Sequence, residues 1–134
     1  MRSFRAADDV AMNALRSAGF RGTGPSAWYL LRSIPPTGGR ASTLARELGV
    51  TKQAVGQTLK ELEREGYVEK ETDPADGRAL CVRPTPEGLA VALRGEKALL
   101  AQERSWEQYL GRRRLHALRE GMEAFADFLE EERR

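Results

Sequence analysis

Apolar residues recur every three or four positions along most of the chain, and this spacing predicts helices. The predicted helices cover residues 3–18, 24–34, 41–48, 51–65, 85–110 and a last segment from 112 onward. Period-two alternation occurs in residues 67–72 and 79–83, which predicts two strands, and the turn-forming run DPADGR separates them. Residues 38–40 are expected to add a short third strand. The pattern predicts a mainly α protein with a small β-hairpin.

Residues 41–65 form a helix, a tight turn and a second helix. The first helix carries Leu44 and Leu48 on one face and ends at Gly49, where a left-handed backbone favours glycine. Thr51 can cap the second helix, because its hydroxyl accepts a free backbone N–H of the first turn. This order of elements is that of a helix-turn-helix.

The second helix has one apolar and one polar side. Val55, Leu59 and Leu62 make the apolar stripe. The opposite side carries Lys52, Gln53, Gly56, Gln57 and Lys60. Acidic residues occur only after Lys60. Gln can pair with adenine and Lys with guanine, so the first half of this helix suits a DNA groove. Gly56 permits close approach to the bases. An ordinary solvated helix face is the alternative.

The hairpin after this helix favours DNA binding, because a helix-turn-helix followed by a β-hairpin is a winged helix. Arg78 lies near the predicted hairpin tip, where it would follow the DNA backbone or enter the minor groove. Asp76 is expected to orient Arg78 or to close the turn.

Residues 44–88 resemble the core of the MarR family of bacterial transcriptional regulators. The residues that carry the resemblance are Leu62, Glu63, Gly66, Asp73, Asp76, Arg78, Thr85 and Gly88. The order of the flanking helices extends it over essentially the whole chain. It implies a DNA-binding homodimer held by the N- and C-terminal helices. Two positions depart from the pattern: Gly77 replaces a frequent second basic residue, and Pro84 replaces an aliphatic one, so the second wing strand is expected to end early.

The 134 residues predict a single domain, with residues 35–84 as the DNA-binding core and residues 1–20 and 85–134 as dimerisation helices. The last helix carries a heptad-like apolar seam, which one small domain cannot cover. Its members are Leu115, Leu118, Met122, Phe125 and Leu129.

Charge is spread evenly. The net charge is +2, and residues 40–84 carry 8 basic and 8 acidic side chains. DNA binding must therefore rest on the local placement of a few cations. These are Arg40, Lys52, Lys60, Arg78 and Arg83. The neutrality keeps a second hypothesis open, a winged-helix module that binds protein and not DNA.

Other chemistry is sparse. One His (His116) and one Cys (Cys81) do not make a common zinc site, and no nucleotide or hydrolase motif is present, so neither an enzyme nor a cofactor is predicted. Cys81 is either a space-filling strand residue or a redox sensor. Trp28, Tyr29 and Trp106 are candidates for lining a small-molecule effector pocket, although aromatics at helical spacing are more often core. The absence of a long apolar run and of a signal-peptide pattern predicts a cytoplasmic protein.

Overall fold

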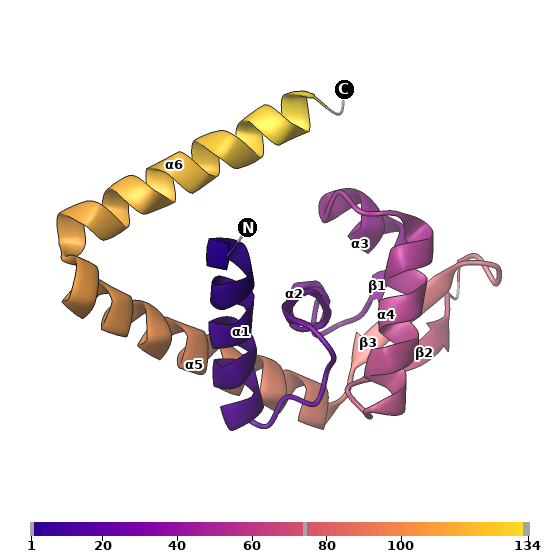
Figure 1. Cartoon of the computed structure of the whole chain (residues 1–134). Helices are drawn as coiled ribbons and strands as arrows, with labels where there is room; N and C mark the ends of the chain where they lie inside the picture. Colours follow the sequence, from indigo (N-terminus) through magenta and orange to yellow (C-terminus); the bar gives the residue numbers. More distant parts are fainter. Residues whose placement is uncertain (1, 74, 133–134) are drawn as a thin grey trace. The chain divides into compact units, whose positions relative to one another are not determined.

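The structure, a computed structural model, describes residues 2–73 and 75–132, and only the backbone of residues 2–4 (Figure 1). The helices are α1 (Arg2–Ser17), α2 (Pro25–Ser33), α3 (Ala41–Glu47), α4 (Lys52–Arg64), α5 (Pro86–Leu110) and α6 (Arg112–Glu131). The strands are β1 (Gly39–Arg40), β2 (Val68–Thr72) and β3 (Leu80–Pro84). The chain divides into two compact units, Met1–Leu99 and Leu100–Arg134.

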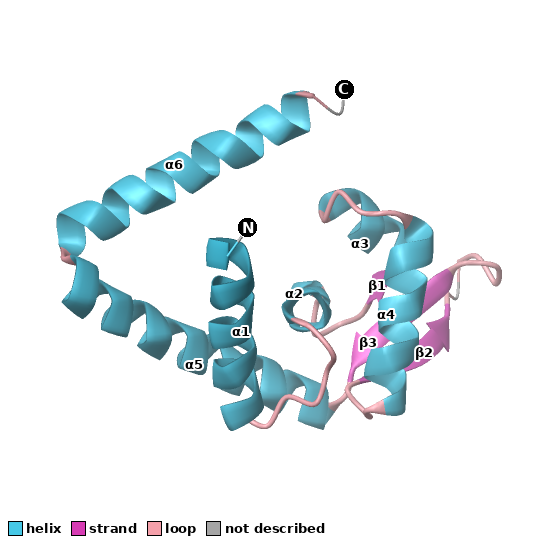
Figure 2. Ribbon diagram, in the orientation of Figure 1, coloured by secondary structure: helices cyan, strands magenta, loops and turns pink. Residues whose placement is uncertain are grey.

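The predicted winged helix is confirmed in the first unit. The three strands form an antiparallel sheet in the order β1-β3-β2, and α4 packs on β2 (Figure 2). In the register of the wing, Lys70 lies opposite Val82 and Thr72 opposite Leu80. The predicted third strand is β1, where Gly39 pairs with Val82.

The expectation that Pro84 ends the second wing strand early is wrong. Pro84 is the last residue of β3 and pairs with Val68. Proline cannot donate to a neighbouring strand, but β1 reaches only Val82 and Cys81, so no partner on that side needs a donor at this position. The ladder to the β2 side even continues, because the Thr85 N–H donates to the Tyr67 carbonyl at 2.9 Å.

One apolar core joins α1, α2, α4, the sheet and the first half of α5. Its fully buried members include Leu15, Leu31, Leu59, Tyr67, Val82 and Val91. Two glycines let α5 approach this core closely. A Cβ at Gly88 would lie 2.0 Å from the Tyr67 carbonyl oxygen, and one at Gly95 would lie 2.3 Å from Trp28 Nε1. Any side chain at either position would push α5 away.

The second unit consists of the end of α5, the turn at Gly111 and α6. Gly111 has φ of +80°, the left-handed conformation that favours glycine, and it separates the two helices as predicted. Arg119 forms an ion pair with Glu103, and Arg112 donates to Glu107 at 3.0 Å. The Arg112 pair neutralises one of the three consecutive arginines, Arg112, Arg113 and Arg114, that begin α6.

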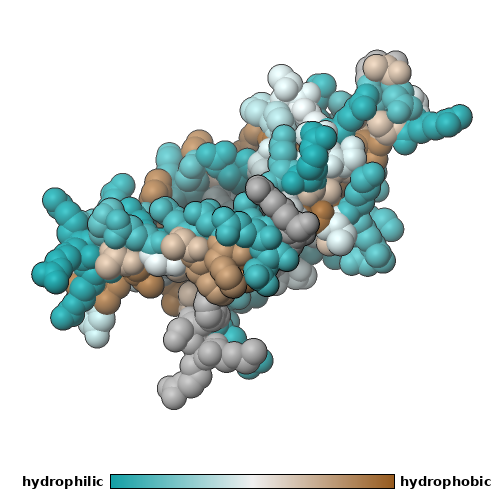
Figure 3. All heavy atoms as spheres, turned by 90° about the horizontal axis from the view of Figure 1, so that it is seen from above, coloured by the Kyte–Doolittle hydropathy of each residue, from teal (hydrophilic) through white to brown (hydrophobic). Residues whose placement is uncertain are grey.

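Large apolar side chains also remain at the surface, where brown groups lie among teal ones (Figure 3). In the second unit the exposed members on α6 are Leu118, Met122, Phe125, Phe128 and Leu129. None of the helices within residues 2–73 and 75–132 has the length and apolar character needed to cross a membrane.

Candidate nucleic-acid interface

The helix-turn-helix places α4 with its first turn at the surface. Gly49 has φ of +64°, which ends α3 and reverses the chain. The Thr51 hydroxyl then accepts the Ala54 N–H at 3.1 Å, so the predicted cap is confirmed. Thr51 and Lys52 are both exposed, and α4 therefore begins with its positive end toward solvent.

The two sides of α4 separate as the sequence predicts. Val55, Leu59 and Leu62 are at most 2% exposed and hold the helix on the core. The opposite side presents exposed Lys52, Gln53, Gln57 and Lys60. A Cβ built at Gly56 meets nothing within 4 Å, so this position lies open between the two glutamines.

The acids in the second half of α4 and at its C-cap, Glu65, all have partners. Glu61 accepts from the Thr23 backbone N–H at 2.6 Å and from its hydroxyl at 2.9 Å. Glu63 pairs with Lys70 at 2.6 Å, and Glu65 pairs with Arg21 at 2.9 Å. Their negative charges are thus paired, and they lie at the C-terminal end of the helix.

Lys52 and Lys60, in contrast, have no carboxylate within ion-pair distance anywhere in residues 2–73 and 75–132. The N-terminal half of α4, which we call its outer half, is therefore a positive, donor-rich surface, although residues 40–84 as a whole are neutral. Such a surface is suited to a nucleic acid, which is a polyanion whose base edges form hydrogen bonds.

The wing adds one free cation. Arg78 is exposed and has no carboxylate within ion-pair distance among the described residues. Asp76 closes the turn, because its Oδ1 accepts the Arg78 backbone N–H at 3.1 Å and does not contact the guanidinium. Of the two roles expected for Asp76, the structure supports turn closure.

Two other cations predicted to serve this surface are engaged elsewhere. Arg40 Nε donates to Asp73 Oδ2 at 2.6 Å, and Arg83 lies 3.2 Å from Glu71. The Ala75 backbone N–H, together with the Arg40 guanidinium, holds the pKa of Asp73 below its usual value. Arg40 is therefore tied to the base of the wing, and a DNA contact from it stays a prediction.

The three aromatic candidates for an effector pocket do not share one pocket in the first unit. Trp28 is 4% exposed, and its ring lies edge-on to Tyr29 with centroids 5.2 Å apart. Tyr29 is 55% exposed and lines an apolar pocket of about 300 Å³ with Leu48 and Val50. Trp106 belongs to the second unit.

The remaining candidate groups occupy ordinary places. Cys81 is a half-buried free thiol on β3, and His116 lies 3.3 Å from Glu120 on the surface of α6. Within residues 2–73 and 75–132, no three His, Cys, Asp or Glu side chains are grouped so as to hold a metal ion.

Known proteins resemble this chain in both sequence and fold. The model of the MarR family matches residues 22–79. A transcriptional regulatory protein for the hcr operon of Thauera aromatica is 28% identical over 90 residues, which are 66% of this chain and 54% of that protein. The chain thus spans about half the length of this curated relative.

Two solved structures share the architecture. The PcaV transcriptional regulator from Streptomyces coelicolor, in complex with its natural ligand, matches with a TM-score of 0.77 at 21% identity, over 94% of this chain and 87% of that one. The transcriptional repressor CouR, bound to a 23-mer DNA duplex, matches with a TM-score of 0.76 at 22% identity, over 93% and 87% of the two chains. At these identities the likeness establishes the winged-helix fold.

Proposed function

We propose that this chain is a MarR-family transcriptional regulator that binds a pseudo-palindromic DNA operator as a homodimer through its winged-helix core. The observation that carries the proposal is the outer half of α4. Gln53 and Gln57 are exposed one turn apart on its polar side, and the open Gly56 lies between them. This arrangement lets α4 enter a major groove and read base edges, while the unpaired Arg78 of the wing contacts phosphates.

The homodimer follows from the apolar face of α6. Leu118, Met122 and Phe125 are 50%, 58% and 53% exposed in one chain, and their steps of four and three form a seam. A patch of this kind marks an interaction surface, and a second copy supplies a matching seam. We assign residues 35–84 to DNA binding, and residues 1–20 and 85–134 to dimerisation.

Repression is the regulatory outcome that we infer, because a dimer that covers an operator excludes other proteins from the same DNA. CouR, which shares this fold, is a transcriptional repressor bound to DNA. The protein would act in the cytoplasm, where a regulator can bind bacterial DNA.

A small-molecule effector fits the same scheme. PcaV was solved with its natural ligand, and here the apolar pocket beside Tyr29 is lined by Ala54, Val55 and Thr58 of α4 itself. A neutral apolar molecule bound there would touch the helix that reads DNA and would alter its affinity.

The test is selection of bound duplexes from a random pool, followed by titration of the selected site and a scrambled duplex at several salt concentrations. We expect specific binding at least about 10³-fold tighter than non-specific binding, with affinity that falls as salt rises. Equal affinity for both duplexes would contradict the proposal. It would favour instead the neutral winged helix as a protein-binding module.

A further inference from the structure

We propose that Glu61 and Glu65 are positioning residues, which hold α4 on the loop of residues 18–23 and so set the spacing of the two half-sites that the dimer reads. This inference rests on the proposed function. It assigns a role to the acidic half of α4, which does not face the DNA in that scheme.

Glu61 makes a two-point contact with Thr23. One carboxylate oxygen accepts the Thr23 backbone N–H at 2.6 Å, and the other accepts its hydroxyl at 2.9 Å. Both hydrogen bonds are charge-assisted, and their pairing fixes direction as well as distance. The two residues are 38 positions apart in the sequence, so the contact joins separate elements.

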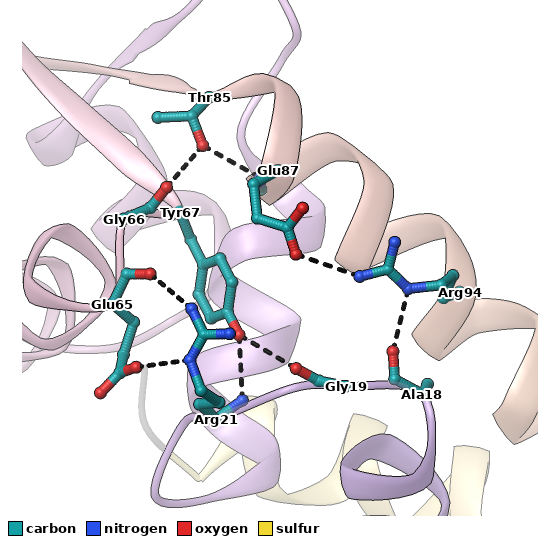
Figure 4. Close-up of polar contacts among 10 residues, drawn as sticks. Ala18, Gly19, Arg21, Glu65, Gly66, Tyr67, Thr85, Glu87 and Arg94 are labelled. Carbon is teal, nitrogen blue, oxygen red and sulfur yellow. Dashed lines mark hydrogen bonds and ion pairs between the residues drawn. The ribbon is translucent and has the colours of Figure 1, made fainter.

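Glu65 makes the second contact, with Arg21. The guanidinium donates through Nε to the Glu65 carboxylate and through Nη2 to the Glu65 backbone carbonyl, both at 2.9 Å (Figure 4). The same guanidinium lies 5.1 Å from the centroid of the Tyr67 ring. Arg21 therefore contacts the C-terminal end of α4 through the side chain and backbone carbonyl of Glu65, and it also contacts the Tyr67 ring.

The loop of residues 18–23 is also hydrogen-bonded to Tyr67 and to α5. Tyr67 is 0% exposed, and its hydroxyl accepts the Arg21 N–H at 3.0 Å and donates to the Gly19 carbonyl at 3.2 Å (Figure 4). Arg94 of α5 donates to the Ala18 carbonyl at 3.0 Å. These hydrogen bonds thus connect the loop to Tyr67, just after α4, and to the first half of α5.

The length of α4 makes this connection important for DNA reading, because a small tilt about the held end displaces the other end. The two contacts lie near one end of the helix, and Lys52 lies about 16 Å away at the other end, at 1.5 Å per residue. A tilt of about 12° about the held end would move the outer turn by about 3.4 Å, the length of one base pair. Since α1 belongs to the proposed dimerisation helices, the angle between α1 and α4 determines how far apart the two reading helices lie.

A simpler view is that these pairs only add stability. Glu63 separates the two views, because it lies on the same helix, carries the same charge and pairs with Lys70 of the adjoining strand β2. Glu63→Ala removes an acid and an ion pair from α4 without touching the loop. Glu61→Gln is the conservative variant, since its amide oxygen can still accept the Thr23 N–H.

The experiment uses the full-length protein and the duplex that the wild type selects from a random pool. The half-sites are kept and the spacer is changed by one or two base pairs, and a duplex with one half-site is included. We expect the wild type, Glu63→Ala and Glu61→Gln to prefer one spacer at least about tenfold over its neighbours.

Glu61→Ala, alone or with Glu65→Ala, should reduce this preference to within about threefold and leave the affinity for the single half-site within about twofold of wild type. Thr23→Val, which removes one donor and leaves the charge of α4 intact, should cause a smaller loss of the preference. Hydrogen exchange without DNA should show a faster Thr23 amide in Glu61→Ala and unchanged amides in the middle of α4.

A wild-type spacer profile in Glu61→Ala would overturn the inference, as would a profile that changes equally in Glu63→Ala. Loss of single half-site binding in Glu61→Ala would also overturn it, because the residue would then support α4 as a whole. A wild type that selects no sequence is a different result, since it contradicts the proposed function itself.

Discussion

The Arg40 guanidinium donates to the Asp73 carboxylate at 2.6 Å and thereby joins two segments that are 33 residues apart. Arg40 ends β1 and immediately precedes α3, while Asp73 follows the last residue of β2. The other carboxylate oxygen of Asp73 accepts the Ala75 N–H at 2.8 Å. Asp73 therefore holds the base of the wing loop and connects it to the start of the helix-turn-helix.

This geometry predicts an acid-dependent loss of stability. The pKa of Asp73 is lowered in the folded protein, first by the Ala75 N–H and then by Arg40, so folding favours the carboxylate. The contribution is complete above the unfolded pKa of about 3.9, and it is lost as pH falls through the folded value. Wild type should be more stable than Asp73→Asn at pH 7, and their unfolding midpoints in urea should converge below about pH 4. Parallel curves at all pH values would show that the charge of Asp73 contributes nothing.

Arg78 is expected to contribute affinity without sequence preference. Arg78→Ala should weaken binding to the selected site and to random DNA together, and it should reduce the slope of log K against log salt by about one. Filter binding at four salt concentrations measures this slope. Arg83→Ala is the matched control, because Arg83 is already paired with Glu71 and should change the slope much less. An unchanged slope in Arg78→Ala would mean that the wing has no role in affinity.

The sequence predicts those features whose causes are local. The sequence predicts Thr51 as a cap, and its hydroxyl accepts the Ala54 backbone N–H. The Thr85 hydroxyl accepts the Gly88 N–H in the same way at the start of α5. The left-handed turn at Gly49 was recognised in the same way. Caps, turns and apolar spacing depend on residues within a few positions, so one sequence is enough to find them.

Contacts between distant segments were not predictable in this way. Arg40 looked like a free cation, because nothing near it in the sequence shows that Asp73 will reach it. The contacts of Glu61 and Glu65 are unpredictable for the same reason, since their partners lie on the loop of residues 18–23. The only sequence signal was that the acids of α4 cluster in its second half, and this signal does not name a partner.

Gly56 should separate stability from DNA binding. A Cβ at this position meets nothing within 4 Å, so Gly56→Ala should stabilise the protein by about 0.5–1 kcal/mol through helix propensity. The same methyl group would occupy the surface that approaches the bases, and affinity for the selected site should fall. Thermal unfolding and DNA titration of the same sample test both effects.

Gly121→Ala is the control for this change, because Gly121 is also helical and open. It should give a similar gain in stability with unchanged DNA affinity. A Gly56→Ala protein that binds DNA as well as wild type would show that α4 does not approach the bases at this position.

Gln53 and Gln57 should carry sequence preference. Replacing either by Ala should cost about 1–3 kcal/mol on the selected site and change binding to random DNA little, because an amide reads bases and adds no charge. Competition titrations with single-base variants of the site would locate the base that each residue reads. Gln108→Ala, an exposed glutamine of α5, should have no effect on either DNA. Equal losses on both DNAs would mean that Gln53 and Gln57 only position the protein.

The last prediction concerns the seam of α6. Leu118 and Phe125 are 50% and 53% exposed in the single chain, and burying such side chains contributes about 1.5–3 kcal/mol each. Leu118→Glu combined with Phe125→Glu should therefore convert the dimer to monomers, measured by sedimentation velocity. Affinity for the two-half-site duplex should collapse with it, since a monomer reads only one of two half-sites about 34 Å apart.

The matched control adds the same two charges to the same helix. Ala117 and Ala124 each precede a seam residue by one position and are exposed, so Ala117→Glu combined with Ala124→Glu should leave the dimer intact. Both proteins should retain the circular dichroism of the first unit, because its core does not include α6. A wild-type protein that sediments as a monomer at roughly 50 micromolar would refute the dimer directly. It would also weaken the case for specific DNA binding, since a single neutral winged helix has few free cations with which to hold one site among many.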